Sequence, residues 1–302
     1  MSCILTQREN NMKIGFIGLG NMGLPMAGNL AGADHVVVGF DPAAPARPPL
    51  KAVGSAAEAA ADADIVITML PNGEILRAVA AEIIPAMRKG ALLCDCSTVD
   101  VSSARDVAAQ ASAAGLGILD APVSGGVAGA SAGTLTFMVG GSQADFATMK
   151  PLFDIMGARA IHCGDTGSGQ AAKLCNNMIL GVTMIATCEA FALADKLGLD
   201  RQKLFDVAST SSGSSWSMNA YCPAPGVGPD SPSDHDYRPG FAAELMLKDL
   251  NLSQQAAESV DADTPMGQLA QQIYATFVDE EGGRGRDFSS MLPRFSGRGR
   301  AG

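Results

Sequence analysis

A glycine-rich segment near the start of the chain has the spacing of a dinucleotide-binding turn. Gly18, Gly20 and Gly23 form G-x-G-x-x-G, directly after the apolar run 13–17 and before a helix-like stretch. In such a turn the first glycine permits the bend, the second lets the backbone approach a pyrophosphate, and the third lets helix and strand pack closely. The alternative is a purely structural turn. We expect a pyrophosphate to bind the N–H groups of this turn, which consists of Gly18, Leu19, Gly20, Asn21, Met22 and Gly23.

An acidic residue follows the second apolar run at the distance expected for ribose recognition. Asp41 lies 21 residues after Gly20, at the end of the run 35–40. A carboxylate here accepts hydrogen bonds from the ribose hydroxyls and repels a 2′-phosphate. The next residues are Pro42-Ala-Ala, with no arginine before Arg47. The pattern therefore predicts NAD, in preference to NADP, as the cofactor.

A lysine and an asparagine stand one helical turn apart in an apolar segment. Lys173 is the only lysine or arginine between Arg159 and Lys196, and Asn177 follows it by four residues. Residues four apart share a helix face, so an ammonium and an amide would meet the same ligand. The alternative is a surface lysine whose charged end reaches water.

A serine followed by two glycines offers a different kind of chemistry. Ser124, Gly125 and Gly126 supply a hydroxyl and backbone N–H groups in a flexible segment. Such a combination can cradle an anion. A tight turn between strands is compatible with the same residues.

These residues require a scaffold, and the apolar runs indicate which one. Runs at 13–17, 35–40, 64–70 and 91–95 alternate with Ala-rich helical stretches, and 117–120 and 134–139 are further strand candidates. Near-continuous apolar strands alternating with helices are typical of a parallel, doubly wound α/β sheet of the Rossmann type. Leu70 and Pro71 end the third run, at the sheet edge where ligands bind, although an ordinary strand exit explains them equally well.

The pattern changes near Gly164. Residues 168–197 form one long apolar helix, and 201–211, 242–260 and 264–277 also read as helices, with no convincing strand. The segments expected are an unstructured extension (1–11), a nucleotide-binding domain (12–167), a connecting helix (168–197) and an all-helical domain (198–302).

Composition excludes several classes of protein. The 302 residues carry a net charge of −10, which disfavours a nucleic-acid partner, and 47% are hydrophobic, which disfavours disorder. The most apolar stretch, 178–188, is too short to span a membrane. Scattered cysteines and three histidines predict neither a metal site nor a disulfide framework, and we expect a reducing, cytoplasmic location.

Several motifs together resemble the β-hydroxyacid dehydrogenase family, over about residues 13–290. They are GFIGLGNMGLPMAGNL at the start, DAPVSGGVAGASAGTLTFMVGG from Asp120, GSGQAAKLCNNM from Gly167 and FAAELMLKDLNL from Phe241. Motifs in the same order are more specific than one nucleotide fingerprint. The resemblance implies reversible oxidation of a short 3-hydroxyacid with NAD.

The resemblance also implies roles for individual residues. Lys173 would be the acid/base group with Asn177 beside it, and both would contact the substrate, whose carboxylate binds Ser124, Gly125 and Gly126. The residues implied to contact the cofactor are Leu70, Pro71, Thr98, Phe241 and Lys248, in addition to the glycine turn and Asp41. Asp249 would support the site. Ile75 departs from the family, which has a polar residue near this position.

The sequence leaves two alternatives for the function. One is a related reductase of a short semialdehyde; the other is a non-catalytic dinucleotide-binding sensor, which Lys173 and Asn177 disfavour. The long apolar helix leaves surface to cover, so we expect a homodimer or homotetramer.

Overall fold

The computed structural model describes residues 11–297. Apart from Asn11, the extension expected at residues 1–11 lies outside the described residues. The chain divides into two compact units, Met1–Lys173 and Leu174–Gly302.

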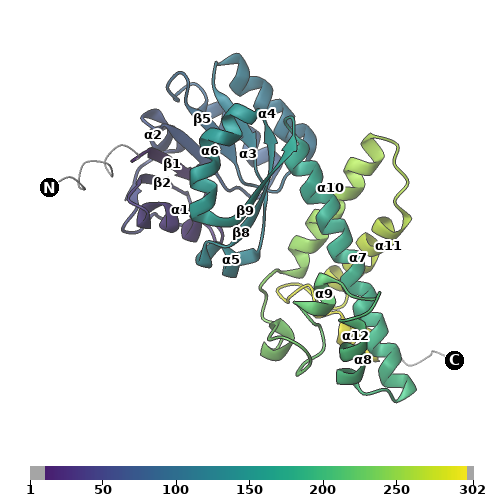
Figure 1. Cartoon of the computed structure of the whole chain (residues 1–302). Helices are drawn as coiled ribbons and strands as arrows, with labels where there is room; N and C mark the ends of the chain where they lie inside the picture. Colours follow the sequence, from purple (N-terminus) through teal and green to yellow (C-terminus); the bar gives the residue numbers. More distant parts are fainter. Residues whose placement is uncertain (1–10, 298–302) are drawn as a thin grey trace. The chain divides into compact units, whose positions relative to one another are not determined.

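The first unit is built on a sheet that has nine strands within the described part of the chain (Figure 1). Their order is β3-β2-β1-β4-β5-β6-β8-β7, and β9 pairs with β8. The strands are β1 (Lys13–Ile17), β2 (Val36–Phe40), β3 (Lys51–Ala52), β4 (Ile65–Thr68), β5 (Leu92–Asp95), β6 (Gly117–Asp120), β7 (Val123–Ser124), β8 (Leu135–Gly141) and β9 (Gly157–Gly164).

The pairings from β3 to β6 are parallel, and the strand order reverses between β1 and β4 as in doubly wound nucleotide-binding sheets. The expected doubly wound, mainly parallel sheet is therefore confirmed, with antiparallel pairings at its other end. There β8 runs antiparallel to β6 and β7, whereas β9 runs parallel to β8. Strand β9 was not predicted from the sequence, because its mostly exposed or half-buried residues form no apolar run.

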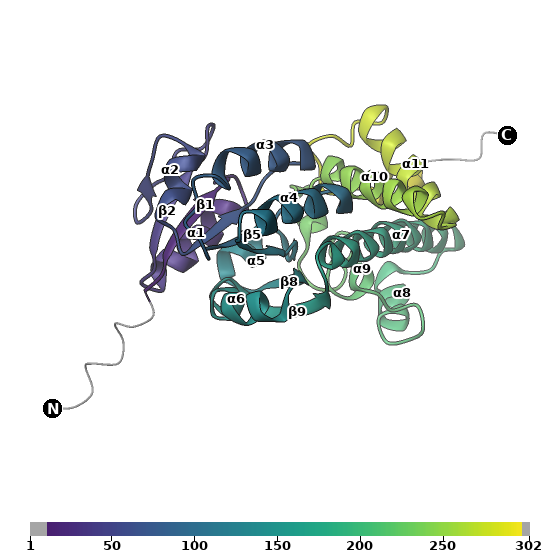
Figure 2. The same cartoon turned by 90° about the horizontal axis from the view of Figure 1, so that it is seen from above.

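Helices cover both faces of this sheet (Figure 2). One apolar core contains side chains of α1, α5 and α6, and the other contains side chains of α2, α3 and α4. Strand side chains alternate between the two cores: Ile65 and Ile67 enter the first and Val66 the second. The helices are α1 (Gly23–Gly32), α2 (Ala56–Ala61), α3 (Gly73–Ile83), α4 (Val101–Ala113), α5 (Gly126–Ala132) and α6 (Gln143–Met156).

The second unit is helical within the described residues. Its core gathers side chains of the long helix α7, including Met184, Cys188 and Phe191, with those of α10 and α11. No strand is assigned in it, and a single isolated bridge joins Ala242 to Asp287. The helices are α7 (Ser168–Leu197), which begins in the first unit, α8 (Arg201–Ala208), α9 (Trp216–Asn219), α10 (Ala243–Ser259), α11 (Pro265–Asp279) and α12 (Leu292–Gly297).

Helix α7 is long and apolar. By length and composition the whole helix is long and apolar enough to cross a membrane, although its most apolar stretch, 178–188, is too short to do so. Half of its most apolar window is buried inside the structure. The helix also buries the polar side chains of Gln170, Lys173 and Asn177, so part of it belongs to the interior of the protein.

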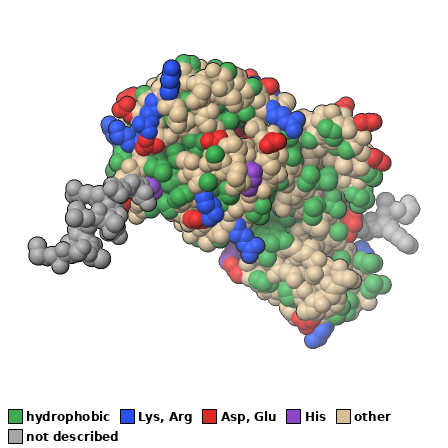
Figure 3. All heavy atoms as spheres, turned by 45° about the horizontal axis from the view of Figure 1, so that its top comes forward, with side chains coloured by type: hydrophobic (Ala, Val, Ile, Leu, Met, Phe, Trp, Pro, Cys, Tyr) green, Lys and Arg blue, Asp and Glu red, His purple; other side chains and the backbone are tan. Residues whose placement is uncertain are grey.

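Charged side chains are mixed on the face drawn in Figure 3. Lys and Arg lie singly or beside Asp and Glu there, without a broad basic patch. This distribution agrees with the negative net charge of the chain.

Candidate active site

The glycine turn after β1 has three glycines in three different environments. Gly18 has φ +94°, and a Cβ there would lie 2.2 Å from the carbonyl oxygen of Met69. A Cβ on Gly23 would lie 1.9 Å from the carbonyl oxygen of Gly18. Around Gly20 no atom lies within 4 Å of such a Cβ. The turn is therefore compact at its two ends and open in the middle, where the backbone can approach a ligand.

Helix α1, which follows the turn, has an open N-terminus. Among the described residues no side chain caps it, whereas Ser55, Asn72 and Asp100 cap α2, α3 and α4. An uncapped N-terminus leaves N–H groups and the positive end of the helix dipole for an anion. This arrangement suits a pyrophosphate.

The Asp41 carboxylate braces the glycine turn. Its Oδ2 accepts a hydrogen bond from the Leu19 N–H at 2.7 Å, and its Oδ1 accepts from Ala43 and Ala44 at 2.7 and 2.8 Å. An ionised carboxylate offers about four acceptor positions, so capacity remains for a ribose hydroxyl. Asp41 therefore combines a structural role with the position expected of a ribose ligand.

The ends of β4 and β5 are linked by hydrogen bonds. The Leu70 N–H donates to Ser97 Oγ at 2.7 Å, and the hydroxyls of Thr68 and Ser97 donate to Asp95 Oδ1 at 2.7 and 2.6 Å. Thr98 follows directly and is half-buried. Leu70 and Thr98 thus lie at neighbouring strand ends, on the edge of the sheet that also carries the glycine turn.

Two buried carboxylates face this edge of the sheet. Asp95 and Asp120 are register partners on β5 and β6, and each is 2% exposed. Asp95 Oδ2 is buried without a hydrogen-bond partner in the described structure. Burial raises the pKa of Asp95 to about 6, although the Ser97 and Thr68 hydroxyls oppose the shift. Burial also raises the pKa of Asp120.

Asp120 fixes the start of α7. Its Oδ1 accepts from the Gly167 N–H at 2.7 Å and its Oδ2 from the Gln170 N–H at 2.9 Å. A Cβ on Gly169 would lie 2.4 Å from the carbonyl oxygens of Asp120 and Met138. The helix therefore begins in direct contact with the sheet, and its first turn has little freedom to move.

Lys173 and Asn177 are both buried in α7. Their relative exposures are 7% and 1%, and they stand one turn apart on a continuous helix. The alternative of a surface lysine is therefore excluded. Buried polar side chains of this kind are rare unless they are paired or serve a ligand.

The loop between β7 and α5 has the conformation that its glycines allow. Gly125 has φ +134° and Gly126 has φ +61°, a region that other residues rarely adopt. Ser124, the last residue of β7, is half-buried. The loop lies in the same unit as Lys173, Thr98 and the glycine turn.

In the second unit, Asp249 holds Asn177. Asn177 Nδ2 donates to Asp249 Oδ2 at 2.5 Å, and Lys248 Nζ lies 3.4 Å from Asp249 Oδ1. Asp249 is 3% exposed, so this pair is shielded from water. The consecutive residues Lys248 and Asp249 thus lie together with Asn177.

Phe241 is positioned by a buried carboxylate. Asp287, which is fully buried, accepts hydrogen bonds at Oδ2 from the N–H groups of Gly240 and Phe241 and from the Tyr221 hydroxyl, at 2.9, 3.0 and 2.9 Å. The Tyr221 ring stacks on Trp216 with 4.8 Å between centroids. Trp216 is 54% exposed and is therefore not a core residue.

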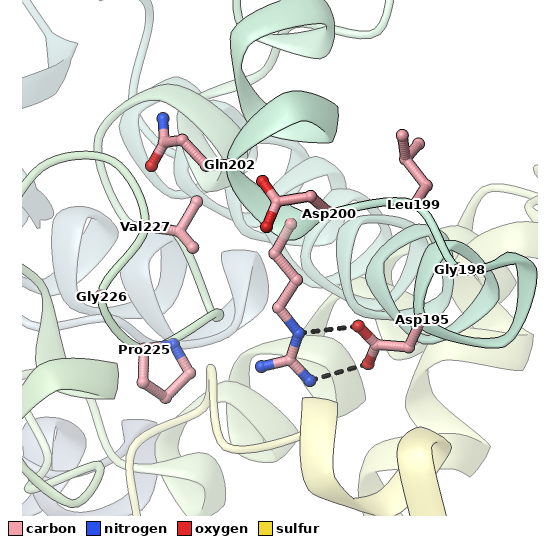
Figure 4. A pocket seen from close by; sticks show the side chains of 9 residues that line it. Asp195, Gly198, Leu199, Asp200, Gln202, Pro225, Gly226 and Val227 are labelled. Atoms are coloured by element: carbon pink, nitrogen blue, oxygen red, sulfur yellow. Dashed lines mark hydrogen bonds and ion pairs between the residues drawn. The ribbon is translucent and has the colours of Figure 1, made fainter.

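A pocket lies elsewhere in the second unit (Figure 4). It is a shallow, open hollow between the end of α7 and the loop 225–227, and it contains none of the predicted site residues. Its Arg201 forms a double hydrogen bond with Asp195, at 2.8 and 2.7 Å. The one guanidinium among the residues that line this pocket is therefore already paired with a carboxylate.

Two family models match the chain. One, described as the NAD binding domain of 6-phosphogluconate dehydrogenase, matches residues 13–164. The other, described as NAD-binding of NADP-dependent 3-hydroxyisobutyrate dehydrogenase, matches residues 167–295.

Known proteins are similar to this chain over almost its whole length. A probable 3-hydroxyisobutyrate dehydrogenase of Mycobacterium tuberculosis is 49% identical over 284 residues, 92% of this chain and 96% of that protein. An NAD-dependent L-serine dehydrogenase of Pseudomonas aeruginosa is 45% identical over 291 residues, 94% and 97% of the two chains. The solved structure of the M. tuberculosis 3-hydroxyisobutyrate dehydrogenase with L-serine has a TM-score of 0.89 at 46% identity, covering 94% and 99%. This chain belongs to the 3-hydroxyisobutyrate dehydrogenase family.

Membership confirms the expected Rossmann-type fold and the family resemblance. The chain is an NAD-dependent hydroxyacid dehydrogenase, and its cofactor is NAD. The alternative of a non-catalytic sensor is not supported. The open space at Gly20, the uncapped α1 and the Asp41 carboxylate fit this cofactor, since together they offer room, N–H donors and a hydroxyl acceptor.

Three buried polar residues of this dehydrogenase were not predicted as site residues from the sequence. Asp95 and Asp120 each end an apolar strand run, a signal that would have placed them at the ligand edge of the sheet. Gln170 stands three residues before Lys173 and hence on the same helix face, but nothing in the sequence shows what it contacts. Ile75, which departs from the family pattern, lies in the first turn of α3 and is 38% exposed.

Proposed function

We propose that this dehydrogenase oxidises 3-hydroxyisobutyrate to methylmalonate semialdehyde, with Lys173 as the general base. The observation that carries the proposal is the burial of Lys173 one turn before Asn177, on a helix whose start is fixed to the sheet by Asp120. A rigid helix is a good support for an acid/base group, because proton transfer requires hydrogen-bond distance to the reacting hydroxyl.

The reaction removes a hydride from the carbinol carbon and a proton from its hydroxyl. Bound NAD supplies the hydride acceptor. In the proposed mechanism, Lys173 Nζ accepts the hydroxyl proton as the carbon–oxygen double bond forms, and returns it in the reverse reaction. Asn177 holds the substrate hydroxyl or the lysine amine beside it. Its amide orientation is supported by the 2.5 Å bond to Asp249.

The loop of Ser124, Gly125 and Gly126 is proposed to bind the substrate carboxylate. The positive φ angles of the two glycines give the backbone a shape that other residues rarely allow, and the Ser124 hydroxyl adds a side-chain donor. Hydrogen bonds to a charged group are worth about 1.5–3 kcal/mol each. This loop would therefore select acids over neutral alcohols.

L-Serine is the second candidate substrate. One similar protein is named an NAD-dependent L-serine dehydrogenase, and the structurally similar M. tuberculosis protein was solved with L-serine. L-Serine is also a 3-hydroxyacid, with an ammonium group where 3-hydroxyisobutyrate has a methyl group. Tartronate semialdehyde, glyoxylate and succinate semialdehyde are further candidates for the reverse reaction.

A substrate panel tests the proposal. NADH formation is followed with both enantiomers of 3-hydroxyisobutyrate, with L-serine and D-serine, and with 3-hydroxypropionate, each with NAD and with NADP. The proposal predicts the highest kcat/KM for one enantiomer of 3-hydroxyisobutyrate with NAD. A higher kcat/KM for L-serine would contradict the proposed substrate but not the proposed mechanism. If none of these hydroxyacids is oxidised, both the substrate and the mechanism are wrong.

We further propose that the enzyme acts in valine breakdown in the cytoplasm, as a homodimer or homotetramer. The assembly is supported by exposed apolar side chains on α7: Ile179 (60%), Leu193 (59%) and Leu197 (74%). Sedimentation at several concentrations tests it. The cytoplasmic location is supported by the free cysteines of the described residues.

A further inference from the structure

One buried side chain in the first unit joins the end of β5 to the start of α7. Gln170 is completely buried, and its Nε2 donates to the Ser97 carbonyl oxygen at 2.8 Å. Its Oε1 accepts from the Val99 N–H at 3.1 Å. Thr98 lies between these two contacts, so the Gln170 amide holds the backbone on both sides of Thr98.

The backbone of Gln170 is held in place as well. The Gln170 N–H donates to Asp120 Oδ2 at 2.9 Å, and Lys173 follows three residues later on the same helix face. Gln170 therefore connects three parts of the unit: the carboxyl end of β6, the segment that carries Thr98 and the turn of α7 that carries Lys173.

The connection continues toward the glycine turn. Ser97, whose carbonyl oxygen accepts from Gln170, also accepts at Oγ from the Leu70 N–H at 2.7 Å. Leu70 follows Met69, whose carbonyl oxygen lies close enough to Gly18 to exclude any side chain there. A continuous path of contacts thus runs from Lys173 along the helix to the turn expected to bind the pyrophosphate.

We propose that Gln170 is a positioning residue for hydride transfer, which fixes the Thr98 segment at the carboxyl end of β5 relative to Lys173. The proposal rests on the proposed function, because it assigns Lys173 to the substrate hydroxyl and Thr98 to the cofactor. Hydride and proton leave adjacent atoms of one substrate. The hydride acceptor and the proton acceptor must therefore be held at fixed positions relative to each other. A misplacement of about 1 Å can lower the rate by about 10²-fold.

The test uses Gln170→Met, which keeps the length of the side chain and removes both hydrogen bonds. Ile83→Val is the control, since it trims a core side chain of α3 in the same unit and no role at the site is assigned to Ile83. For each variant we would measure the melting temperature, the dissociation constant of NAD by calorimetric titration, and kcat and KM. Thr98→Ala and the double variant complete a mutant cycle.

We expect Gln170→Met to lower kcat by about tenfold to a hundredfold and to weaken NAD binding several-fold, beyond any change seen in Ile83→Val. Thr98→Ala, added to Gln170→Met, should then lower kcat and NAD affinity much less than it does in the unmodified enzyme. If kcat and NAD binding match those of Ile83→Val, or if the two substitutions act independently, the positioning role is wrong.

A second variant is available if Gln170→Met does not fold, and failure of the proposed function can be distinguished from failure of the positioning role. If Gln170→Met does not fold, Gln170→Glu retains the acceptor for the Val99 N–H, loses the donor to Ser97 and is measured in the same way. If the unmodified enzyme oxidises none of the hydroxyacids, the proposed function fails by itself. NAD binding in the mutant cycle still decides whether Gln170 acts through Thr98.

Discussion

Asn177 and Asp249 are joined side chain to side chain, with 2.5 Å between Nδ2 and Oδ2. Both residues are at least 97% buried, and the carboxylate can only accept, so the bond determines which end of the Asn177 amide faces Asp249. The Asn177 oxygen is directed elsewhere and accepts from Asn176 Nδ2 at 3.0 Å. Asp249 therefore orients an amide that is proposed to contact the substrate.

Asp249→Ala should lower kcat by tenfold or more and destabilise the protein, because a buried amide that loses its partner costs about 1–3 kcal/mol. Asp249→Asn, which keeps an oxygen able to accept, should recover part of kcat. Glu258→Ala, at an exposed position of the same helix, is the control. Kinetics and thermal unfolding of the three variants check this expectation, and an Asp249→Ala enzyme with unchanged kcat would contradict it.

Lys173→Ala should abolish turnover and leave NAD affinity nearly unchanged. General acid–base catalysis contributes about 10² to 10⁴ in rate, so the loss of kcat should reach at least that range. Lys196→Ala removes an exposed lysine from the last turn of the same helix and should change neither quantity. Near-normal kcat in Lys173→Ala would refute the assignment of the general base.

Much of the first unit could be predicted because its strands are continuous apolar runs. The central strands β1, β4 and β5 are buried on both faces, and their sequences show this directly. By contrast, β9 has no apolar run, and its pairing with β8 depends on contacts made elsewhere in the fold. The helix α7 was predicted with its observed limits because its apolar pattern is long and ends at Gly198.

The site was predictable in part for similar reasons. The glycine turn and the Lys173–Asn177 pair are local patterns, with spacings that carry physical meaning. The contacts of Gln170 with residues 97 and 99, and of Asp287 with Tyr221 and Phe241, join positions far apart in the chain. One sequence contains no signal for such pairs, because a buried amide or carboxylate can find its partners in many ways.

The enzyme should prefer NAD to NADP by at least about tenfold in kcat/KM, or about 1.4 kcal/mol. The reason is repulsion between the Asp41 carboxylate and a 2′-phosphate. Asp41→Ser combined with Pro42→Arg should narrow or invert the ratio. Asp62→Asn, which removes a charge from an exposed position, should not. Because Asp41 also braces the Leu19 N–H, melting temperatures must accompany the kinetics. Equal use of both cofactors by the unmodified enzyme would show that Asp41 does not face the ribose.

Asp95 should make stability fall as the pH rises from about 4 to above 6. Burial raises its pKa from 3.8 to about 6, so the folded state binds the proton more tightly than the unfolded state. That stabilisation is present at low pH and is lost as the pH passes the folded pKa. Asp95→Asn has no such titration. When the pH is raised from 4.5 to 7.5, the free energy of unfolding of the variant should therefore rise by about 2 kcal/mol relative to that of the unmodified protein. Urea unfolding at both pH values measures the difference, and a constant difference would show that Asp95 does not titrate in this range.

The Ser124 loop should determine selectivity for a carboxylate. If the hydroxyl of Ser124 and the N–H groups of Gly125 and Gly126 bind the substrate anion, the methyl ester or amide of 3-hydroxyisobutyrate leaves these donors unpaired and should be a far poorer substrate. Ser124→Ala should raise KM for the acid, with a loss of about 1.5–3 kcal/mol for one charge-assisted hydrogen bond, and should disturb NAD binding less. Ser142→Ala, which removes the N-cap of α6, is a control for the loss of a serine hydroxyl in the same unit. Comparable kcat/KM for the acid and its ester would refute the anion cradle and indicate a general alcohol dehydrogenase.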